Sequence, residues 1–400
     1  MGRGGISAGC HSGHRRRVGL MDLTRDVIAS RGHPLWAEVD LGALRHNVRE
    51  LKRIAGTAEL MGVVKGYAYG HGNPRSAEAI LAGGATRLGV ARVAEALHLR
   101  EAGIKEPIHV FTEPPDEAAA TIVANDLTAT IYTPRFARVL SEAAIAAGSS
   151  VPVHVKLDTG MHRVGVMAED VLDAVGVFKT LEGLRIEGAW SHLAVADVPD
   201  HPFTQKQIDL FHDLVGKIEK AGVPLRFKHI ANSAATLSTP ASHLDVVRCG
   251  VALYGLWPGP QLAGSADLKP VLSLKARVNM VKEVPAGEAL SYGLEYELDA
   301  RGKVVTVPVG YADGYDRRLS GRGEVGIAGK RYRVSGTVCM DQFMVDVGED
   351  TVAVGSTVVL IGNDGEISIS AEELAEKLGT INYEITSRIP SRVPRVYIDG

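Results

Sequence analysis

The amino-acid sequence predicts a TIM-like α/β barrel of the (β/α)8 type, followed by a mostly antiparallel β domain. Between about residues 60 and 255, eight short apolar runs alternate with Ala-, Leu- and Glu-rich helical segments. The runs are continuously apolar, as expected for parallel strands that are buried on both faces. After Gly264 helical segments become scarce and strand-like segments follow one another closely, which is typical of an antiparallel all-β domain.

The elements of the barrel are assigned from these runs in chain order. The predicted strands are 60–64, 87–93, 107–112, 128–133, 151–158, 185–193, 226–232 and 246–255. The predicted helices are 44–54, 76–82, 94–102, 116–125, 134–147, 168–181 and 204–221. An open doubly wound sheet is the alternative, but no GxGxxG fingerprint follows the first strands, and eight βα units of this length favour a closed barrel.

One further strand is predicted before the barrel. Residues 36–41 alternate polar and apolar side chains, which indicates a half-buried strand, and this strand can pair with the C-terminal domain. Asp40 is placed to cap the helix that follows, and Gly56 is placed to end it.

The C-terminal domain is predicted from its strands and from one late helix. The strands are 272–281, 303–309, 324–327, 330–334 and 351–361. The helix is 370–378, where Ser370 and Glu373 have the spacing of a capping box. The boundary is placed at about residue 265, so that residues 33–265 form the barrel and 266–400 the β domain.

The composition narrows the class of protein. Of the 400 residues, 45% are hydrophobic and 23% charged, and the net charge is -3, which predicts no nucleic-acid partner and no membrane partner. The three cysteines have no CxxC spacing, so neither a disulfide framework nor a zinc site is expected. No apolar run reaches about 18 residues, as a membrane-spanning helix requires. We therefore expect a protein of a reducing compartment, the cytoplasm.

The first 32 residues differ from the rest. They carry Arg15, Arg16 and Arg17 among Gly, Ser and His, with few apolar residues. This composition predicts a disordered basic tail, and the lack of an apolar core argues against a secretory or twin-arginine signal. Translation that starts at Met21 is an alternative.

A lysine stands at the end of the first barrel strand. In the stretch 63–72, VVKGYAYGHG, the apolar run ends at Lys65 and glycines and aromatics follow at once. A buried ammonium is costly unless it is paired, deprotonated or used covalently, so Lys65 is a candidate Schiff-base former. A lysine that only extends out of the barrel mouth is the alternative.

Other polar residues also fall at strand ends, where barrels of this type place their active sites. They are Lys156, Asp158, His192, Asn232, Ser233 and Arg248. Taken singly, these residues also have structural explanations. His192 can be a core histidine, Asp158 can form a turn, and Arg248 can form an ion pair with Asp245. Ser233 with the backbone of Gly250 and Val251 can form a phosphate cup, and a lysine beside such a cup predicts pyridoxal 5′-phosphate (PLP).

Several longer motifs carry a resemblance to a known family. They are VVKGYAYGHG at 63–72, KLDTGMHRVG at 156–165, WSHLAVAD at 190–197, ANSAA at 231–235, VRCGVALYGLWP at 247–258, SYGLEY at 291–296, PVGYADGY at 308–315, VCMDQFMVD at 338–346 and INYE at 381–384. With these motifs in this order, the chain resembles alanine racemases from residue 36 to about 395. The resemblance implies a homodimeric isomerase that uses PLP to interconvert L- and D-alanine for cell-wall peptidoglycan.

The resemblance also implies roles for residues at the cofactor. Lys65 would form the Schiff base with PLP and act as one base, and Tyr292 of the other subunit would be the second base. Tyr69 would contact the phosphate. His192 and Arg248 would extend a hydrogen-bond chain, with Arg248 facing the pyridine nitrogen.

Further residues are implied at the substrate. Arg163 and the backbone of Met340 would hold the carboxylate, Tyr311 would line the entrance, and Lys156 would be carbamylated. Two positions depart from many relatives: Ser391 is expected where a cofactor-contacting tyrosine stands, and His162 where glycine is common.

Three alternatives stay open on the sequence alone. A racemase of broader or different range, including serine, shares all of these motifs. A barrel-type PLP decarboxylase shares the cofactor and barrel but lacks the basic partner at the ring nitrogen. A PLP carrier without catalysis would have no need of a second base such as Tyr292.

Overall fold

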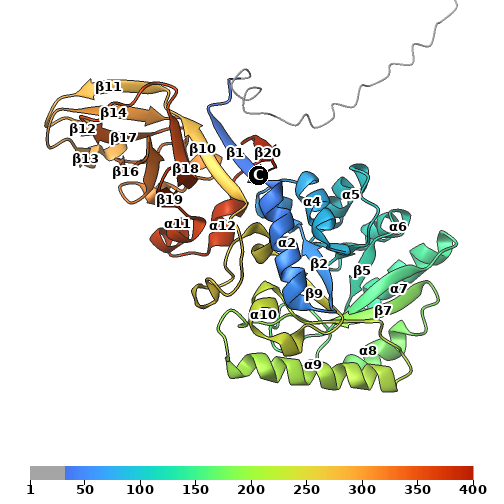
Figure 1. Cartoon of the computed structure of the whole chain (residues 1–400). Helices are drawn as coiled ribbons and strands as arrows, with labels where there is room; N and C mark the ends of the chain where they lie inside the picture. Colours follow the sequence, from blue (N-terminus) through green and yellow to red (C-terminus); the bar gives the residue numbers. More distant parts are fainter. Residues whose placement is uncertain (1–31, 400) are drawn as a thin grey trace, which may run out of the picture.

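The structure is a computed structural model that describes residues 32–399. Apart from Gly32, the predicted basic tail lies outside the described residues. A parallel-stranded barrel and a β domain lie side by side, and the N-terminal strand runs along the β domain (Figure 1).

The barrel consists of eight parallel strands, each within or next to a predicted one, but most are shorter than predicted, and the end of the strand predicted at 246–255 is a 3-10 helix, Val251–Tyr254. They are β2 (Glu59–Val63), β3 (Arg87–Val90), β4 (Ile108–Val110), β5 (Thr128–Ile131), β6 (Val151–Lys156), β7 (Leu184–Trp190), β8 (Phe227–His229) and β9 (Val246–Cys249). From β2 to β8 each strand pairs with the next in chain order, and β9 pairs with β2. Between β8 and β9, the Arg248 N–H donates to the Ala231 carbonyl at 3.1 Å and the Asp245 N–H to the Lys228 carbonyl at 3.1 Å, which closes the barrel.

Helices cover the outside of this barrel (Figure 1). They are α2 (Leu41–Ala55), α4 (Arg75–Gly83), α5 (Val93–Glu101), α6 (Ala119–Ala124), α7 (Pro134–Ala146), α8 (Val171–Phe178), α9 (Pro202–Lys220) and α10 (Ser233–Ser238). The predicted cap of α2 is confirmed, because Asp40 accepts a hydrogen bond from the Ala43 N–H at 2.8 Å. Gly56 ends the helix with a positive φ of 63°, a conformation that favours glycine.

The β domain is built on one long sheet. Its order is β11-β14-β17-β16-β15-β18-β10-β1-β20, with β19 paired to β18. The strands are β1 (Leu35–Asp40), β10 (Leu272–Arg277), β11 (Met280–Val284), β14 (Gly302–Val307), β15 (Glu324–Ile327), β16 (Lys330–Ser335), β17 (Phe343–Gly348), β18 (Thr357–Asp364), β19 (Ile367–Ile369) and β20 (Arg395–Ile398). Strand β1 pairs antiparallel with β10 and parallel with β20, so the first strand belongs to the sheet of the C-terminal domain.

Some predictions for this domain were wrong. The single strand expected at 272–281 is two strands, since the chain leaves β10 after Arg277 and β11 pairs instead with β14. Strand β18 begins only at Thr357, and the prediction omitted β17, β20 and the short pair β12 (Ala289–Leu290) and β13 (Tyr296–Glu297). A continuous apolar pattern does not reveal the sheet edge at which a strand ends.

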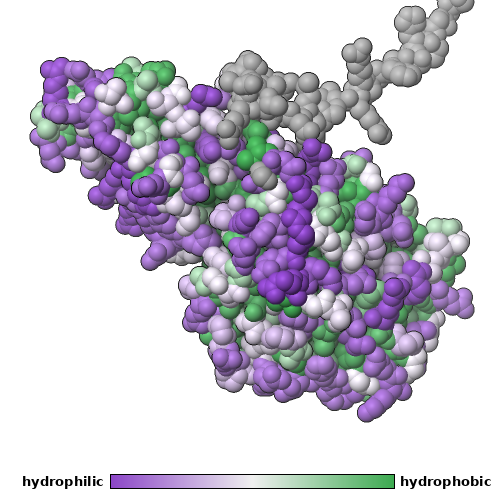
Figure 2. Space-filling view, in the orientation of Figure 1, coloured by the Kyte–Doolittle hydropathy of each residue, from purple (hydrophilic) through white to green (hydrophobic). Residues whose placement is uncertain are grey.

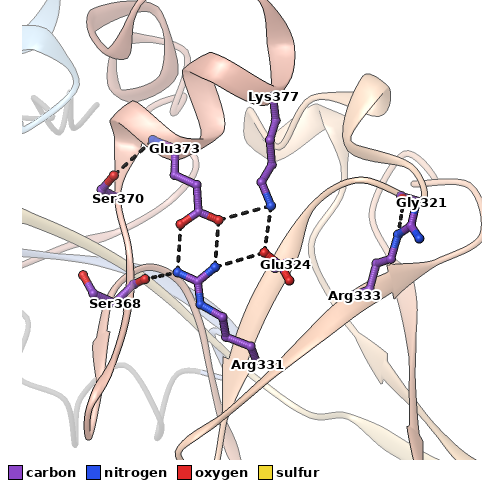
Figure 3. Close-up of polar contacts among 8 residues, drawn as sticks. All are labelled: Gly321, Glu324, Arg331, Arg333, Ser368, Ser370, Glu373 and Lys377. Carbon is purple, nitrogen blue, oxygen red and sulfur yellow. Dashed lines mark hydrogen bonds and ion pairs between the residues drawn. The ribbon is translucent and has the colours of Figure 1, made fainter. Parts of the chain in front are cut away.

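Two helices complete the domain: α11 (Ala371–Leu378) and α12 (Asn382–Ser387). Ser370 caps α11 as predicted, and its Oγ accepts from the Glu373 N–H at 3.0 Å. Figure 3 shows that Arg331 of β16 lies between Glu373 and Glu324, and that Lys377 contacts both carboxylates. This ion network ties α11 to the β15–β16 hairpin.

Hydrophilic residues cover most of the face drawn in Figure 2, and hydrophobic ones form small scattered groups. Among residues 32–399, no helix is both long and apolar enough to cross a bilayer.

Candidate active site

One cavity of about 830 Å³ gathers most of the predicted site. It lies at the carboxyl ends of the barrel strands, where the sequence predicts it. Eight of the predicted residues line it: Lys65, Tyr69, Arg163, His192, Ser233, Arg248, Gly250 and Val251. Residues up to 186 positions apart in the sequence are thus brought to one rim by the closure of the barrel.

Lys65 follows strand β2 and begins the turn α3 (Lys65–Tyr69). Burial lowers the pKa of its amine, and the positive charges of Arg163 and Arg248 act in the same direction. A lowered pKa increases the fraction of neutral amine, which is the nucleophilic form. Lys65 therefore has the environment of a Schiff-base lysine.

The turn after Lys65 is left-handed. Gly66, Tyr67, Ala68 and Tyr69 have φ values of 62°, 56°, 54° and 53°, a conformation that residues with a Cβ atom rarely adopt. The Gly66 N–H donates to Oε1 of Glu95 at 2.7 Å. The sequence predicted only a loop here, because nothing in its composition distinguishes three non-glycine residues with positive φ.

Ser233, Gly250 and Tyr69 form one end of the cavity. Oγ of Ser233 accepts hydrogen bonds from the N–H groups of Gly250 at 2.8 Å and Ala252 at 3.4 Å. A Cβ atom on Gly250 would lie 2.3 Å from the Tyr69 hydroxyl, so only glycine leaves room for this tyrosine. Hydroxyl and backbone N–H groups that converge in this way suit a phosphate.

Arg248 lies buried at the end of β9, and its two Nη groups form hydrogen bonds inside the barrel. It donates to the carbonyl oxygens of Ser191 at 2.7 Å and Ile230 at 3.1 Å, and to Nδ1 of His192 at 3.3 Å. Burial lowers its pKa to about 9, so it remains a cation at neutral pH. The alternative ion pair with Asp245 is wrong, since the Asp245 carboxylate lies 3.6 Å from Lys228 instead.

A chain of buried histidines continues from Arg248 into the barrel. An arginine can only donate, so Nδ1 of His229, 3.1 Å from Nη1 of Arg248, must accept. The proton of neutral His229 is then on Nε2 and is donated to Nδ1 of His154 at 2.8 Å. Burial and the charges of Arg87 and Arg248 lower the pKa of His154 to about 3, which keeps this ring neutral.

His109 completes this group, and the ligand atoms of the three rings lie within 4.8 Å of one another. A metal at Nε2 of His229 would leave that ring without any proton, because its Nδ1 already accepts from Arg248. The cluster is therefore a buried layer of the barrel interior, in which His154 and His229 are hydrogen-bonded to each other and Nε2 of His109 lies 2.8 Å from the Thr130 hydroxyl. The sequence analysis missed it, although His109, His154 and His229 stand on alternate strands, as residues of one barrel layer do.

Lys156 ends strand β6 and is buried. Its Nζ donates to the Leu157 carbonyl at 2.7 Å and lies 5.0 Å from the centre of the Trp190 ring. Burial, with the charge of Arg248, lowers the pKa of Lys156 to about 7. The neutral amine that this favours is the form that reacts with carbon dioxide.

The loop after β6 carries Arg163. Oδ1 of Asp158 accepts hydrogen bonds from the N–H groups of Gly160 at 2.9 Å and His162 at 3.1 Å. Asp158 therefore stabilises the turn, which is the structural role considered for it above. His162 has a positive φ of 53° and an exposed side chain. Its Nδ1 lies 3.6 Å from Asp158.

Three predicted residues lie on the β domain and do not line the cavity. Tyr292, Met340 and Tyr311 are 72%, 54% and 42% exposed. They share one region, which we call the β-domain face: Oγ1 of Thr337 donates to the Tyr292 carbonyl at 2.8 Å, and the Tyr311 N–H donates to the Cys339 carbonyl at 3.1 Å.

The contact expected between Ser391 and the cofactor stays a prediction. Ser391 is exposed and is not among the cavity residues, whereas Tyr383 of α12 lines the cavity. The Tyr383 hydroxyl donates to the Pro258 carbonyl at 2.8 Å. Position 391 follows Pro390 in an outward turn, while α12 packs on the Lys65 turn, where a Cβ on Gly70 would lie 2.0 Å from the Thr386 carbonyl oxygen. Tyr383, within the INYE motif, is thus a C-terminal tyrosine that lines the cavity.

The comparison with known proteins agrees with this geometry. Residues 39–258 match the family model of the alanine racemase N-terminal domain, and residues 271–397 match that of the C-terminal domain. A curated alanine racemase of Desulfovibrio desulfuricans is 43% identical over 93% of this chain and 100% of its own length.

Solved structures agree as well. Alanine racemase from Bacillus anthracis with bound L-Ala-P is 37% identical with a TM-score of 0.88, over 92% of this chain and 95% of that chain. A histidine racemase from Leuconostoc mesenteroides is 30% identical with a TM-score of 0.85, over 92% and 98%. The chain therefore belongs to the alanine racemase family, and it is an enzyme of the amino-acid racemase class.

Proposed function

We propose that this enzyme interconverts L-alanine and D-alanine with PLP held in the barrel cavity, and that its product supplies D-alanine for peptidoglycan in the cytoplasm. The observation that carries the proposal is the position of Lys65. Its amine has a lowered pKa and shares one cavity with the Ser233–Gly250 cup and with the cationic Arg248. A decarboxylase of this cofactor class would lack a basic partner such as Arg248 at the ring nitrogen.

The residues of the cavity fit PLP. Tyr69, Ser233 and the N–H groups of Gly250 and Val251 would hold the phosphate, with Tyr383 beside them. Arg248 would face the ring nitrogen, and Lys65 would bind the aldehyde carbon. When bound, PLP withdraws electrons and so acidifies the α-proton of the amino acid. Gly250 supports the fit, since any side chain there would displace Tyr69.

The chain's own groups would move the proton. Nζ of Lys65, freed by the substrate amine, would take or return the α-proton on one face. Racemisation needs a second base on the opposite face, and we assign it to the hydroxyl of Tyr292 of the partner subunit. A phenol with the ordinary pKa of about 10 is a poor base at neutral pH. Hydrogen bonds from the His192–Arg248 chain would lower that pKa and so make the phenol a better base.

The homodimer follows from this assignment. Tyr292, Met340 and Tyr311 are exposed on the β-domain face and are absent from the cavity of their own subunit. In a homodimer this face would complete the partner's cavity. Tyr311 would line the entrance, while the Met340 N–H and Arg163 would bind the substrate carboxylate. A carbamate on Lys156 would help to hold Arg163, since the charge of Arg163 already acts on Lys156.

The second candidate function is a racemase with a different range of amino-acid substrates. The histidine racemase shares the fold with this chain, so the fold accommodates amino acids other than alanine. His162, next to Arg163, is the departure in this chain that bears on the range, and serine is the first alternative substrate to test.

A chiral product assay tests the proposal. The purified enzyme with PLP should convert L-alanine to an equal mixture of both enantiomers, and faster than it converts serine or histidine. Release of carbon dioxide without D-alanine would assign the decarboxylase instead. Lys65→Ala should lose the visible absorbance of bound cofactor, whereas Lys220→Ala, an exposed lysine of α9, should keep it. Retained absorbance in Lys65→Ala would exclude Lys65 as the anchor.

A further inference from the structure

Arg395, the first residue of β20, reaches across the domain boundary to the Lys65 turn. Its Nε and Nη2 both donate to the Gly70 carbonyl, at 3.0 and 2.7 Å. Nη1 donates to the carbonyls of Pro390 and Val393, each at 2.6 Å, and Nη2 to that of Ile389 at 2.7 Å. These five hydrogen bonds go to four backbone oxygens, and the guanidinium is buried. One side chain thus joins the C-terminal segment to the end of the turn.

The turn needs such support. Tyr67, Ala68 and Tyr69 keep positive φ values that their Cβ atoms disfavour, so contacts from outside the turn must stabilise this conformation. Within the turn, the Ala68 N–H donates to the Val64 carbonyl at 3.0 Å and the Gly70 N–H to the Gly66 carbonyl at 3.1 Å. The carbonyl of Gly70, which accepts none of these bonds, is the group that Arg395 holds.

The C-terminal segment also packs closely on the turn. A Cβ on Gly70 would lie 2.0 Å from the Thr386 carbonyl oxygen, and a Cβ on Gly72 would lie 2.2 Å from the Tyr397 hydroxyl. The Arg395 guanidinium lies 5.3 Å from the centre of the Tyr67 ring. Gly70, Gly72 and the Tyr67 ring thus all face residues 386–397. A shift of these C-terminal residues should therefore move the turn.

We propose that Arg395 is a positioning residue, which fixes the left-handed turn through the Gly70 carbonyl and so sets where the Lys65 amine and the Tyr69 hydroxyl stand in the cavity. The inference rests on the proposed cofactor role of Lys65 and extends it to the β domain of the same subunit. A planar guanidinium can hold Gly70 and the 389–393 carbonyls at once, whereas a lysine is a single point charge.

The alternative is that Arg395 only fastens β20 to the 389–393 turn. Arg331 provides the matched control. It is also an arginine of the β domain with several hydrogen bonds, to Glu373, Glu324 and the Ser368 carbonyl (Figure 3), and none of these partners belongs to the Lys65 turn. Loss of Arg331 weakens the β domain without removing a contact to Gly70.

Hydrogen–deuterium exchange tests the hold on the turn. In the PLP-loaded enzyme and after PLP removal, Arg395→Met should speed exchange of the Ala68, Gly70 and His71 amides by at least about tenfold, as loss of one such hydrogen bond predicts. Arg395→Lys, which keeps the charge and is the milder change for folding, should give a smaller increase. Arg331→Met should leave these amides unchanged while it lowers the midpoint of unfolding in urea.

The cofactor provides the second readout. Arg395→Met should raise the dissociation constant of PLP by about tenfold or more and shift the pH at which its visible band changes, with partial recovery in Arg395→Lys. Unchanged exchange in Arg395→Met, or an equal effect of Arg331→Met on the turn, would overturn the proposal. Faster exchange with an unaltered cofactor band and affinity would also overturn it. Failure of the proposed function would give a different result: the Lys65→Ala enzyme would keep the visible absorbance band of bound PLP.

Discussion

The hydroxyl of Tyr69 occupies the space in which a side chain on Gly250 would begin, 2.3 Å from the Cβ position. The two residues come from the ends of different strands, β2 and β9, and pack only because position 250 is glycine. Tyr69 is thereby held beside Ser233 and the Gly250 N–H, at the end of the cavity that we assign to the phosphate.

Gly250→Ala should displace Tyr69 and weaken cofactor binding. One displaced hydrogen bond and a tight contact predict at least about a tenfold rise in the dissociation constant of PLP, and a loss of about 1–3 kcal/mol in unfolding free energy. Titration of the visible band and urea unfolding measure the two quantities.

Gly216→Ala in α9 is the control. A Cβ there meets nothing within 4 Å, so this change should stabilise the helix by about 0.5–1 kcal/mol and leave cofactor affinity unchanged. Equal cofactor affinity in Gly250→Ala and the wild type would contradict the fit between Gly250 and Tyr69.

Tyr292→Phe should separate the two proton transfers. Loss of one acid–base group predicts a fall of about 10²–10⁴-fold in racemisation. Because the two enantiomers have equal free energies, kcat/KM must fall equally in both directions, so the informative measurement is hydrogen exchange in D2O. One enantiomer should still exchange its α-hydrogen through Lys65 without inversion. Loss of exchange from both enantiomers to the same degree would argue against two bases.

Arg248→Glu should change the outcome of the reaction as well as its rate. Arg248 keeps its proton near neutral pH, so under the proposed function the ring nitrogen facing it should stay unprotonated, which should discourage transamination. A glutamic acid at position 248 can protonate that nitrogen. We expect racemisation to fall by about 10²-fold or more, with pyruvate appearing as a side product.

Pyruvate per D-alanine formed is the quantity to measure. Arg248→Lys retains a cation and should lose activity without forming pyruvate, which separates the protonation effect from disruption of the contacts to Ser191 and Ile230. A folded Arg248→Glu enzyme without pyruvate would contradict the argument.

Lys156 should make stability depend on pH. Its folded-state pKa of about 7 lies below the ordinary value of 10.5, so between these values the unfolded chain binds a proton that the folded protein does not. Unfolding free energy from this group therefore rises as pH increases from about 7 to 10.5, and the full cost of burial applies below pH 7. Lys156→Met should be more stabilising, or less destabilising, at pH 7 than at pH 9.5 in urea unfolding without bicarbonate.

Bicarbonate tests the carbamate at the same lysine. With 13C-labelled bicarbonate near neutral pH, the wild type should show a carbamate resonance and gain stability, and Lys156→Met should show neither. A wild-type protein without the resonance would assign Lys156 as an unmodified neutral amine.

Much of the fold could be predicted because its signals are local. The barrel strands are continuous apolar runs, and Asp40 and Ser370 cap helices by contacts within three residues. The strand-end rule then placed Lys65, His192 and Ser233 at one rim, and the cavity confirms this placement. The sequence did not predict that Tyr383 lines the cavity, because which C-terminal residue faces the cavity depends on how α12 docks on the barrel.

The sequence by itself determined the eight strands of the barrel, the residues at its rim and the all-β class of the C-terminal domain, since these follow from hydrophobic periodicity and from the residues at strand ends. Only the tertiary structure decided the left-handed turn after Lys65, the layer of His109, His154 and His229, and the contact from Arg395 to Gly70, 325 positions away. The physical reason is that positive φ values at residues with a Cβ, and buried charges without carboxylate partners, are unfavourable locally. They persist because distant segments supply the compensating contacts.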